Sequence, residues 1–423
     1  MRDYKNIFEQ RKNDSRYNTS YPLSPSDWAH FRTQETLSFH DEDISFYIHI
    51  PFCEHLCAFC EYTRTICPDE RKQLEYLKAL ENDVSSFMSS HRSGHRLRGF
   101  DIGGGTPTSL SDWSFRYLMQ IFSEACDRME LSDDFEPSIE GTFQTLSEAK
   151  LRMISGSGIS RLSVGIQSSD ETVLRCGGRK NLSLEECLEK RRLIRDCGIG
   201  KLNIDLMYGL KGQTMDNCMR DLEWIKSLDP EQVTLYEFRP NMSKGGAGLS
   251  KEELFGLYKV LYGGIIGQGY KGEFGSNTFS KDGRDRGLSS YLRSRMYEGV
   301  AYKGFGLSAQ SMSCEGVSYN LGKGMKRLDS ILGAESFPEE YTYLLPRDEV
   351  FAKFAAIAAY GGEMSIDVAS KLLDRDMMAD RGDVIRWLEA EEMISVDKKT
   401  VRITEKGFKY YGAVFSMLGD MKV

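Results

Sequence analysis

The sequence predicts an α/β protein built around a partial (β/α)6 barrel. Six short apolar runs rich in β-branched residues recur over residues 41–245, and the first five are each followed by a segment that can form a helix. Strands that alternate with helices imply a parallel sheet with right-handed crossovers. Because six units are too few for the complete eight-unit barrel, a partial barrel is predicted.

The chain passes from each predicted strand to the following helix at the end of the sheet where ligands bind in such folds. The predicted strands are Ile44–Ile50, Leu97–Ile102, Pro137–Phe143, Ser160–Ile166, Lys201–Met207 and Gln232–Phe238. The predicted helices are Asp69–Ser89, Asp112–Met129, Ser147–Ile154, Leu184–Asp196 and Met215–Ser227. Functional side chains are therefore expected at the carboxyl ends of these strands.

Three further regions flank the predicted barrel. Residues 1–40 are polar and turn-rich, which indicates an N-terminal arm with little to fill a core. The small residues of Asn241–Gly248 mark an exit from the barrel, and residues 246–340 are expected to cap the substrate site with helices and glycine-punctuated segments. Residues 341–423 are predicted to be winged-helix-like, with a hairpin at 394–403. The helices expected before that hairpin are Phe351–Ala359, Ile366–Leu373 and Arg381–Glu391.

The composition excludes several classes of protein. The chain has 423 residues, of which 40% are hydrophobic and 28% charged, as expected for a globular protein with a sizeable core. Its net charge of −8 argues against nonspecific binding to nucleic acid, and Arg381–Glu391 lacks the clustered cations that DNA contact needs. No signal segment or membrane-length apolar run is present, so a cytoplasmic monomer without membrane contact is expected.

Three cysteines within eight residues form the most informative motif. Cys53, Cys57 and Cys60 follow the first predicted strand, and thiolates are the ligands of iron–sulfur clusters. Three ligands would leave one iron of a [4Fe–4S] cluster open to an exchangeable molecule. The alternatives are a structural zinc site completed by His55 or Cys67, or three unrelated buried thiols.

Other polar groups are expected at the same edge of the barrel. The GGGTPT motif at Gly103–Thr108 follows the second strand, where glycine lets the backbone approach a ligand closely. Glu140 lies late in the third strand, Gln167 ends the fourth, and Asp205 lies in the fifth. Beside an open iron, these groups suit S-adenosylmethionine (SAM), whose amine and carboxylate can chelate that iron.

The motifs together resemble those of the radical SAM family of oxygen-independent coproporphyrinogen III oxidases and relatives. The segments that carry the resemblance are YIHIPFC at 47–53, the cysteine loop, GGGTPT at 103–108, SVGIQS at 163–168, NIDLMYGLKGQT at 203–214 and, in the arm, RYNTSYP at 16–22. The resemblance covers about residues 15–325 and extends more weakly into the C-terminal region.

This resemblance implies roles for individual residues. Cys53, Cys57 and Cys60 would hold the [4Fe–4S] cluster, and an electron donor such as flavodoxin or ferredoxin would drive reductive cleavage of SAM. The implied contacts to a first SAM are Tyr47, Gly104 and Glu140. The implied contacts to a second SAM are Phe59, Gly105, Thr106, Gln167, Arg179 and Asp205. The side-chain types agree, because a carboxylate can accept from an ammonium or a ribose hydroxyl and an arginine can pair with a carboxylate.

The sequence departs from two branches of that family. The oxidases carry a further cysteine two residues beyond the third cluster ligand, where this chain has Glu61 and Tyr62. Their substrate has four carboxylates, whereas this chain is acidic overall. The haem chaperones carry a His-Asn-x-x-Tyr-Trp signature, where this chain has Ser289-Ser290-Tyr291-Leu292.

These departures favour one-carbon transfer, either methylation or cyclopropanation, from a second SAM to an unsaturated or aromatic small molecule, as in the class C radical SAM methyltransferases and cyclopropanases. Tyr47, Glu61 and Tyr62 are the candidate catalytic residues, and Glu61 or Tyr62 could accept the proton that the adduct loses. The alternatives are coproporphyrinogen oxidase-like decarboxylation or other tetrapyrrole chemistry, and haem chaperoning.

Overall fold

The computed structural model describes residues 2–22, 24–41, 43–67, 69–90, 95–239, 249–324 and 328–421. The predicted α/β class and the six parallel strands are confirmed. In their order across the sheet, these strands are β2 (Asp43–Ile50), β3 (Arg96–Gly104), β5 (Ser138–Gly141), β6 (Arg161–Gln167), β7 (Lys201–Tyr208) and β8 (Gln232–Glu237). Their near-continuous burial is typical of parallel strands that are covered on both faces.

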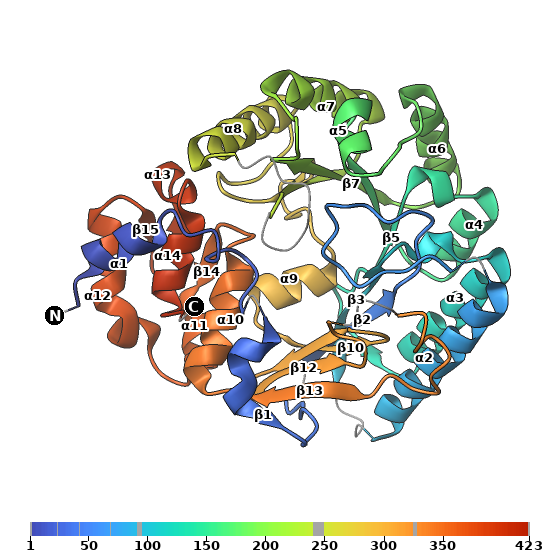
Figure 1. Ribbon diagram of the computed structural model, residues 1–423, viewed down its shortest axis with the longest axis horizontal. Helices are drawn as coiled ribbons and strands as arrows, with labels where there is room; N and C mark the ends of the chain where they lie inside the picture. Colours follow the sequence, from blue (N-terminus) through green and yellow to red (C-terminus); the bar gives the residue numbers. More distant parts are fainter. Residues whose placement is uncertain are drawn as a thin grey trace.

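Helices cover the outer side of these strands (Figure 1). They are α2 (Glu70–Ser90), α3 (Asp112–Asp127), α4 (Glu148–Gly156), α5 (Glu171–Cys176), α6 (Leu184–Asp196) and α7 (Met215–Leu228). Side chains of Ser111, Ser147, Ser183 and Thr214 cap α3, α4, α6 and α7, which explains why these helices begin close to the predicted positions. The sequence did not indicate α5, because six residues are too few to show helical periodicity.

The sheet extends beyond the predicted barrel on both sides. On one side β10 (Ala301–Phe305) pairs parallel to β2, and β11 (Gln310–Ser313), β12 (Gly316–Asn320) and β13 (Glu339–Leu344) follow antiparallel. On the other side β9 (Thr278–Ser280) pairs with β8. The short strand β4 (Glu130–Leu131) pairs with β3. Residues 246–340 therefore add strands to the sheet, as well as the expected helices α8 (Lys251–Gly267) and α9 (Ser290–Tyr297).

The prediction that the arm contributes little to the core was wrong. Its strand β1 (Arg32–Thr33) pairs with β13 at the edge of the sheet, and its helix α1 (Tyr4–Arg11) packs against α14 (Tyr411–Leu418). Tyr21 and Trp28 are buried and both donate hydrogen bonds to Glu349 Oε2, at 2.7 and 3.1 Å. A few isolated aromatic residues anchor a segment whose average composition is polar.

The C-terminal region has the predicted winged-helix-like order. It contains α10 (Arg347–Ala358), α11 (Ile366–Leu373), α12 (Met377–Ala390), β15 (Ile394–Val396), β16 (Thr400–Ile403), α13 (Glu405–Phe408) and α14. An additional strand, β14 (Glu363–Ser365), completes a three-stranded sheet. The predicted exit at Asn241–Gly248, and with it the boundary between residues 245 and 246, lies outside the described residues.

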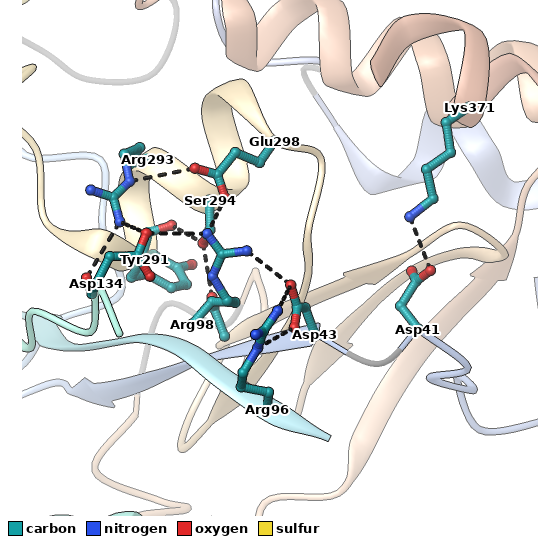
Figure 2. Close-up of polar contacts among 11 residues, drawn as sticks. Asp41, Asp43, Arg96, Arg98, Asp134, Tyr291, Arg293, Ser294, Glu298 and Lys371 are labelled. Carbon is teal, nitrogen blue, oxygen red and sulfur yellow. Dashed lines mark hydrogen bonds and ion pairs between the residues drawn. The ribbon is translucent and has the colours of Figure 1, made fainter. Parts of the chain in front are cut away.

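Ion pairs tie α9 to the amino ends of β2 and β3 (Figure 2). Arg98 donates to Asp43 at 2.8 Å, to Glu298 at 2.7 Å and to Asp134 at 3.3 Å. Arg293 of α9 also donates to Asp134, at 2.5 Å. Each of these carboxylates thus has a cationic partner, and α9 is held against the sheet at the end opposite to the predicted site. Among the described residues, no helix is both long enough and apolar enough to span a membrane.

Candidate active site

A cavity of about 260 Å³ lies at the carboxyl ends of the parallel strands. Thirteen of the fourteen residues that the sequence singled out line it: Cys53, Cys57, Phe59, Cys60, Glu61, Tyr62, Gly104, Gly105, Thr106, Glu140, Gln167, Arg179 and Asp205. Tyr47 is the exception. Its ring stacks on Tyr291, and its hydroxyl lies 3.4 Å from His49 Nδ1. The structure therefore brings the predicted residues together, while their roles stay predictions.

Backbone contacts hold the cysteine loop in place. The Cys53 N–H donates to the carbonyl of Thr65 at 3.0 Å, and the Ala58 N–H donates to the carbonyl of Gly177 at 2.8 Å. The Arg64 guanidinium donates to the carbonyl of Cys57 at 2.5 Å. The loop is thus fixed between the following segment and the end of α5, which orients the three thiols before any ligand binds.

Hydrogen-bond donors reach two of the three sulfurs. Thr106 Oγ1 donates to Cys53 Sγ at 3.7 Å, and Arg179 Nη1 donates to Cys57 Sγ at 3.8 Å. Burial and the neighbouring cysteines raise the pKa of Cys53 to about 11, so cluster binding must displace a proton from this thiol. Among the described residues no group of three His, Cys, Asp or Glu side chains is placed to hold a single metal ion. A [4Fe–4S] cluster does not need such a group, because each of its four irons has its own protein or exchangeable ligand.

The glycine motif packs directly against the cysteine loop and Glu140. A Cβ atom at Gly105 would lie 2.8 Å from Cys53 Sγ, and one at Gly103 would lie 2.6 Å from the Glu140 carboxyl carbon. Gly104 has a φ of +123°, and its N–H donates to Glu140 Oε2 at 3.2 Å. Only glycine permits this approach, so the motif closes one wall of the cavity around thiol and carboxylate groups. The donor set and this close cradle fit a cluster with SAM beside it.

Two carboxyl groups face the cavity from β5 and β7, on either side of β6. Glu140 is open to the cavity, and desolvation by the cavity walls, together with the like charge of Asp205, raises its pKa to about 8. Asp205 accepts hydrogen bonds from Ser163 at 3.0 Å and from Asn203 at 2.8 Å, and burial raises its pKa as well. A cationic ligand group would restore the ionised form of Glu140, since a nearby positive charge favours the carboxylate. This pair therefore suits a ligand that carries an ammonium and hydroxyl groups.

The wall beyond β6 is held by unusual backbone geometry. Gln167 ends β6 with a φ of +70°, a conformation that non-glycine residues rarely adopt. Arg179 donates to the carbonyl of Gly165 and, at 3.3 Å, to Asn181 Oδ1. Phe59 packs against a small apolar cluster that includes Val173. This wall therefore places an apolar ring, an amide and a guanidinium around the same space.

The structure weakens the expected role of Glu61 and Tyr62 as proton acceptors. Glu61 forms an ion pair with Arg239, which occupies its carboxylate. Tyr62 is 55% exposed and faces the cavity, whose walls raise its pKa well above the ordinary tyrosine value. A phenol that stays protonated can donate a proton but is a poor acceptor.

Sequence reasoning missed residues that close the cavity from other parts of the chain. Arg239 follows β8 and donates to Thr19 Oγ1 at 2.7 Å and to Ser20 Oγ at 2.6 Å in the arm. Its position after the sixth strand was the signal that could have identified it. Tyr360 and Tyr411 line the cavity from the C-terminal region, for which the strand pattern offers no signal.

Comparisons with known proteins agree with this fold. Residues 47–225 match the family model of the radical SAM superfamily. The haem chaperone HemW of Bacillus subtilis is 27% identical over 390 residues, which cover 89% of this chain and 100% of HemW. The oxygen-independent coproporphyrinogen III oxidase of Helicobacter pylori is 28% identical over 244 residues, which cover 56% of this chain and 52% of the oxidase.

A solved structure supports the fold over most of the chain. The coproporphyrinogen III oxidase HemN of Escherichia coli superposes with a TM-score of 0.71 at 22% identity, covering 89% of this chain and 90% of HemN. The fold and the site thus define a protein with a radical SAM domain. Over residues 47–225 the chain has a radical SAM domain, and it is similar in sequence to oxygen-independent coproporphyrinogen III oxidases and haem chaperones.

Proposed function

We propose that this protein is a radical SAM enzyme with coproporphyrinogen oxidase-like activity, the oxidative decarboxylation of a carboxylated tetrapyrrole. The observation that carries the proposal is a cavity in which the predicted cluster ligands lie beside cationic side chains. Arg64, Lys180 and Arg239 line it, together with Arg179, although the whole chain is acidic. The same lining contains carboxylates (Glu54, Glu61, Glu140, Asp205 and Glu237). The cationic side chains can still pair with the carboxylates of a substrate, which supports the proposal.

The residues around the cavity fit the two cofactors. Cys53, Cys57 and Cys60 would hold the [4Fe–4S] cluster, and Glu140 would accept a hydrogen bond from the amine of the first SAM. When bound and reduced, the cluster and SAM would supply a radical that removes a hydrogen atom from the substrate, and the electron released with carbon dioxide would pass to an external one-electron acceptor. Asp205 and Arg179 would orient a second SAM, and Phe59 would pack on it. An electron donor such as flavodoxin or ferredoxin would bind near the cysteine loop.

One-carbon transfer is no longer the favoured reaction. It was expected because Glu61 and Tyr62 replace the oxidase pattern and could accept a proton. The ion pair to Arg239 and the raised pKa of Tyr62 remove that argument. The two curated relatives compared above are named an oxidase and a haem chaperone, neither of them a methyltransferase.

Haem chaperoning is the second candidate, because the alignment spans the whole length of a haem chaperone. The segment in which the haem chaperones have a histidine argues against this function, because this chain has Ser289 and Ser290 there. Here Ser289 donates to Asp101 at 2.7 Å, and Ser290 donates to the carbonyl of Glu136 at 3.0 Å. Both serines stabilise the start of α9, and neither can serve as the usual histidine ligand of haem iron.

One anaerobic experiment separates the three reactions. Reconstituted protein with about four irons per chain is incubated with reductant, methyl-labelled SAM and coproporphyrinogen III, and a parallel sample is incubated with haem and SAM. Release of carbon dioxide with formation of 5′-deoxyadenosine supports the proposed decarboxylation. Label in the product would instead establish one-carbon transfer. Haem binding without any cleavage of SAM would favour the chaperone.

A further inference from the structure

The carboxyl end of β6 is irregular where it meets the cavity. The pairing of β6 with β7 shifts by one residue between Gly165 and Gln167, and Gln167 has a φ of +70°. An extra residue in a strand re-aims a side chain, and strained backbone persists only where the surroundings impose it. Contacts from outside the strand must therefore hold Gln167 in this conformation.

Asn181 bridges the backbone on both sides of Gln167. Its amide nitrogen donates to the carbonyl of Ile166 at 2.8 Å and to the carbonyl of Ser168 at 3.0 Å. The segment that carries Asn181 lies between α5 and α6. One short side chain from this segment thus binds both carbonyls that flank the strained residue.

The oxygen of the same amide contacts Arg179. Arg179 Nε donates to Asn181 Oδ1 at 3.3 Å, while its other nitrogens donate to the carbonyl of Gly165 and, at 3.8 Å, to Cys57 Sγ. Asparagine is the short side chain that offers two donors together with an acceptor, so all three contacts of Asn181 depend on this residue type. Asn181 therefore joins the Gln167 backbone to the Arg179 guanidinium.

The side chains of Gln167 and Arg179 meet over Gly165. A Cβ atom at Gly165 would lie 2.5 Å from Gln167 Nε2 and 3.7 Å from Arg179 Nη2. All three of these residues line the cavity, whereas Asn181 is not one of the described residues that do so. A substitution of Asn181 would therefore reach a ligand through the two side chains that Asn181 holds.

A second contact, from α7, fixes the chain just beyond Gln167. Asp221 is fully buried and accepts hydrogen bonds from the Ser169 N–H at 2.5 Å, the Ser169 hydroxyl at 2.7 Å and the Ser168 hydroxyl at 3.1 Å. The strained conformation is thus imposed from two sides. Asp221 fixes the path of the chain, whereas Asn181 also sets the position of Arg179.

We propose that Asn181 is a positioning residue, which holds the Gln167 amide and the Arg179 guanidinium in the orientation that binds a ligand of the cavity. Two groups that are already ordered lose less conformational entropy on binding than two mobile side chains would. A guanidinium beside an amide recognises a carboxylate and a neighbouring polar group. The identity of this ligand as the second SAM rests on the proposed function, whereas the positioning role rests on the contacts of Asn181.

The test measures the binding of labelled SAM to cluster-reconstituted protein by anaerobic equilibrium dialysis. Asn181→Leu removes both donors and the acceptor at similar size, and should weaken SAM binding at least about tenfold, as for lost hydrogen bonds at a charged group. The same change is then made in a protein that already carries Arg179→Met and Gln167→Gly, where glycine accepts the positive φ. There it should weaken binding by no more than about twofold, because the groups that Asn181 positions are gone.

Asn320→Leu is the matched control. Asn320 Nδ2 also donates to two carbonyls that are two residues apart, those of Gly304 at 3.1 Å and Gly306 at 3.0 Å. None of these three residues is among the described residues that line the cavity. Asn320→Leu should lower the melting temperature and leave the affinity for SAM unchanged. Should Asn181→Leu fail to fold, Asn181→Asp makes the same test, since it keeps the size of the side chain and loses both donors.

The outcomes separate positioning from simple stabilisation of the loop. Weaker binding by Asn181→Leu, with little further loss in the combined variant and none in Asn320→Leu, supports the proposal. Unchanged affinity of Asn181→Leu, or the same loss in both backgrounds, overturns it. The supporting pattern with one SAM per cluster would keep the positioning role and exclude the second SAM. The supporting pattern without release of carbon dioxide from coproporphyrinogen III would keep the positioning role and overturn the proposed function.

Discussion

The two ends of the parallel strands hold their charges differently. At the amino ends Arg98 contacts three carboxylates (Figure 2). Burial acts to raise the pKa of Asp43, but hydrogen bonds from Arg96 and Arg98 keep this pKa below its usual value. At the carboxyl ends, desolvation by the cavity walls and the like charge of Asp205 raise the pKa of Glu140. The charges at the amino ends are paired within the fold, whereas Glu140 is left for a ligand to neutralise.

The largest effect is expected at the cavity end, from the cysteine loop. Replacing Cys53, Cys57 or Cys60 with Ala should abolish both the cluster and the formation of 5′-deoxyadenosine, because each thiolate would hold a different iron. Iron content and the absorbance of the cluster measure the first effect. Cys187→Ala, a buried thiol of α6, is the control and should keep the cluster. Tightly bound zinc with no iron requirement would contradict the prediction.

At the amino end, the largest effect should be on folding. Arg98→Met removes the shared partner of Asp43, Asp134 and Glu298, so the free energy of unfolding should fall by about 2 to 3 kcal/mol. Denaturant unfolding measures this change. Activity per folded molecule should be unchanged, since Arg98 lies at the far end of the strands. An unchanged free energy of unfolding in Arg98→Met would mean that these ion pairs do not stabilise the fold.

A cavity carboxylate should affect binding rather than folding. Asp205→Ala should weaken binding of the second SAM by about 2 kcal/mol, as expected for losing hydrogen bonds to a charged group. Equilibrium dialysis against labelled SAM should show two molecules bound per cluster in the wild type. Asp127→Ala, at the exposed end of α3, should leave both the stoichiometry and the affinity unchanged. One bound molecule per cluster at saturation would contradict the paired cofactor.

The sequence predicted the parallel strands and the site at their carboxyl ends better than it predicted the other strands of the sheet. Apolar residues recur along the eight-residue strands β2 and β7. The rule that functional groups follow parallel strands brought Cys53 and Asp205 to one cavity. Strands such as β11 are only four residues long and serine-rich, so no alternation was visible.

The pairing of charges had no sequence signal of its own. Only the tertiary structure places Arg98 beside Asp43, Asp134 and Glu298, which are distant from one another in the sequence. Pairing, or its absence, is a property of tertiary structure, so the feature that distinguishes the two ends of the strands is the one that a single sequence shows least.

The last expected effect is the pH dependence of stability at Glu140. Its pKa is about 8 in the folded protein, against 4.5 for an ordinary glutamate. Between these values the folded state binds more protons at this site than the unfolded state, so its contribution to stability should fall as pH rises. Glu140→Gln should therefore flatten the fall in the free energy of unfolding between pH 5 and 8, measured by denaturant titrations without SAM. Glu75→Gln, on the exposed face of α2, should leave the slope unchanged.

Because a bound ammonium would favour the carboxylate, saturating SAM should reduce the slope in the wild type and have less effect on the slope of Glu140→Gln. An identical slope in the wild type and Glu140→Gln would mean that Glu140 is already paired within the fold, like the carboxylates at the amino end.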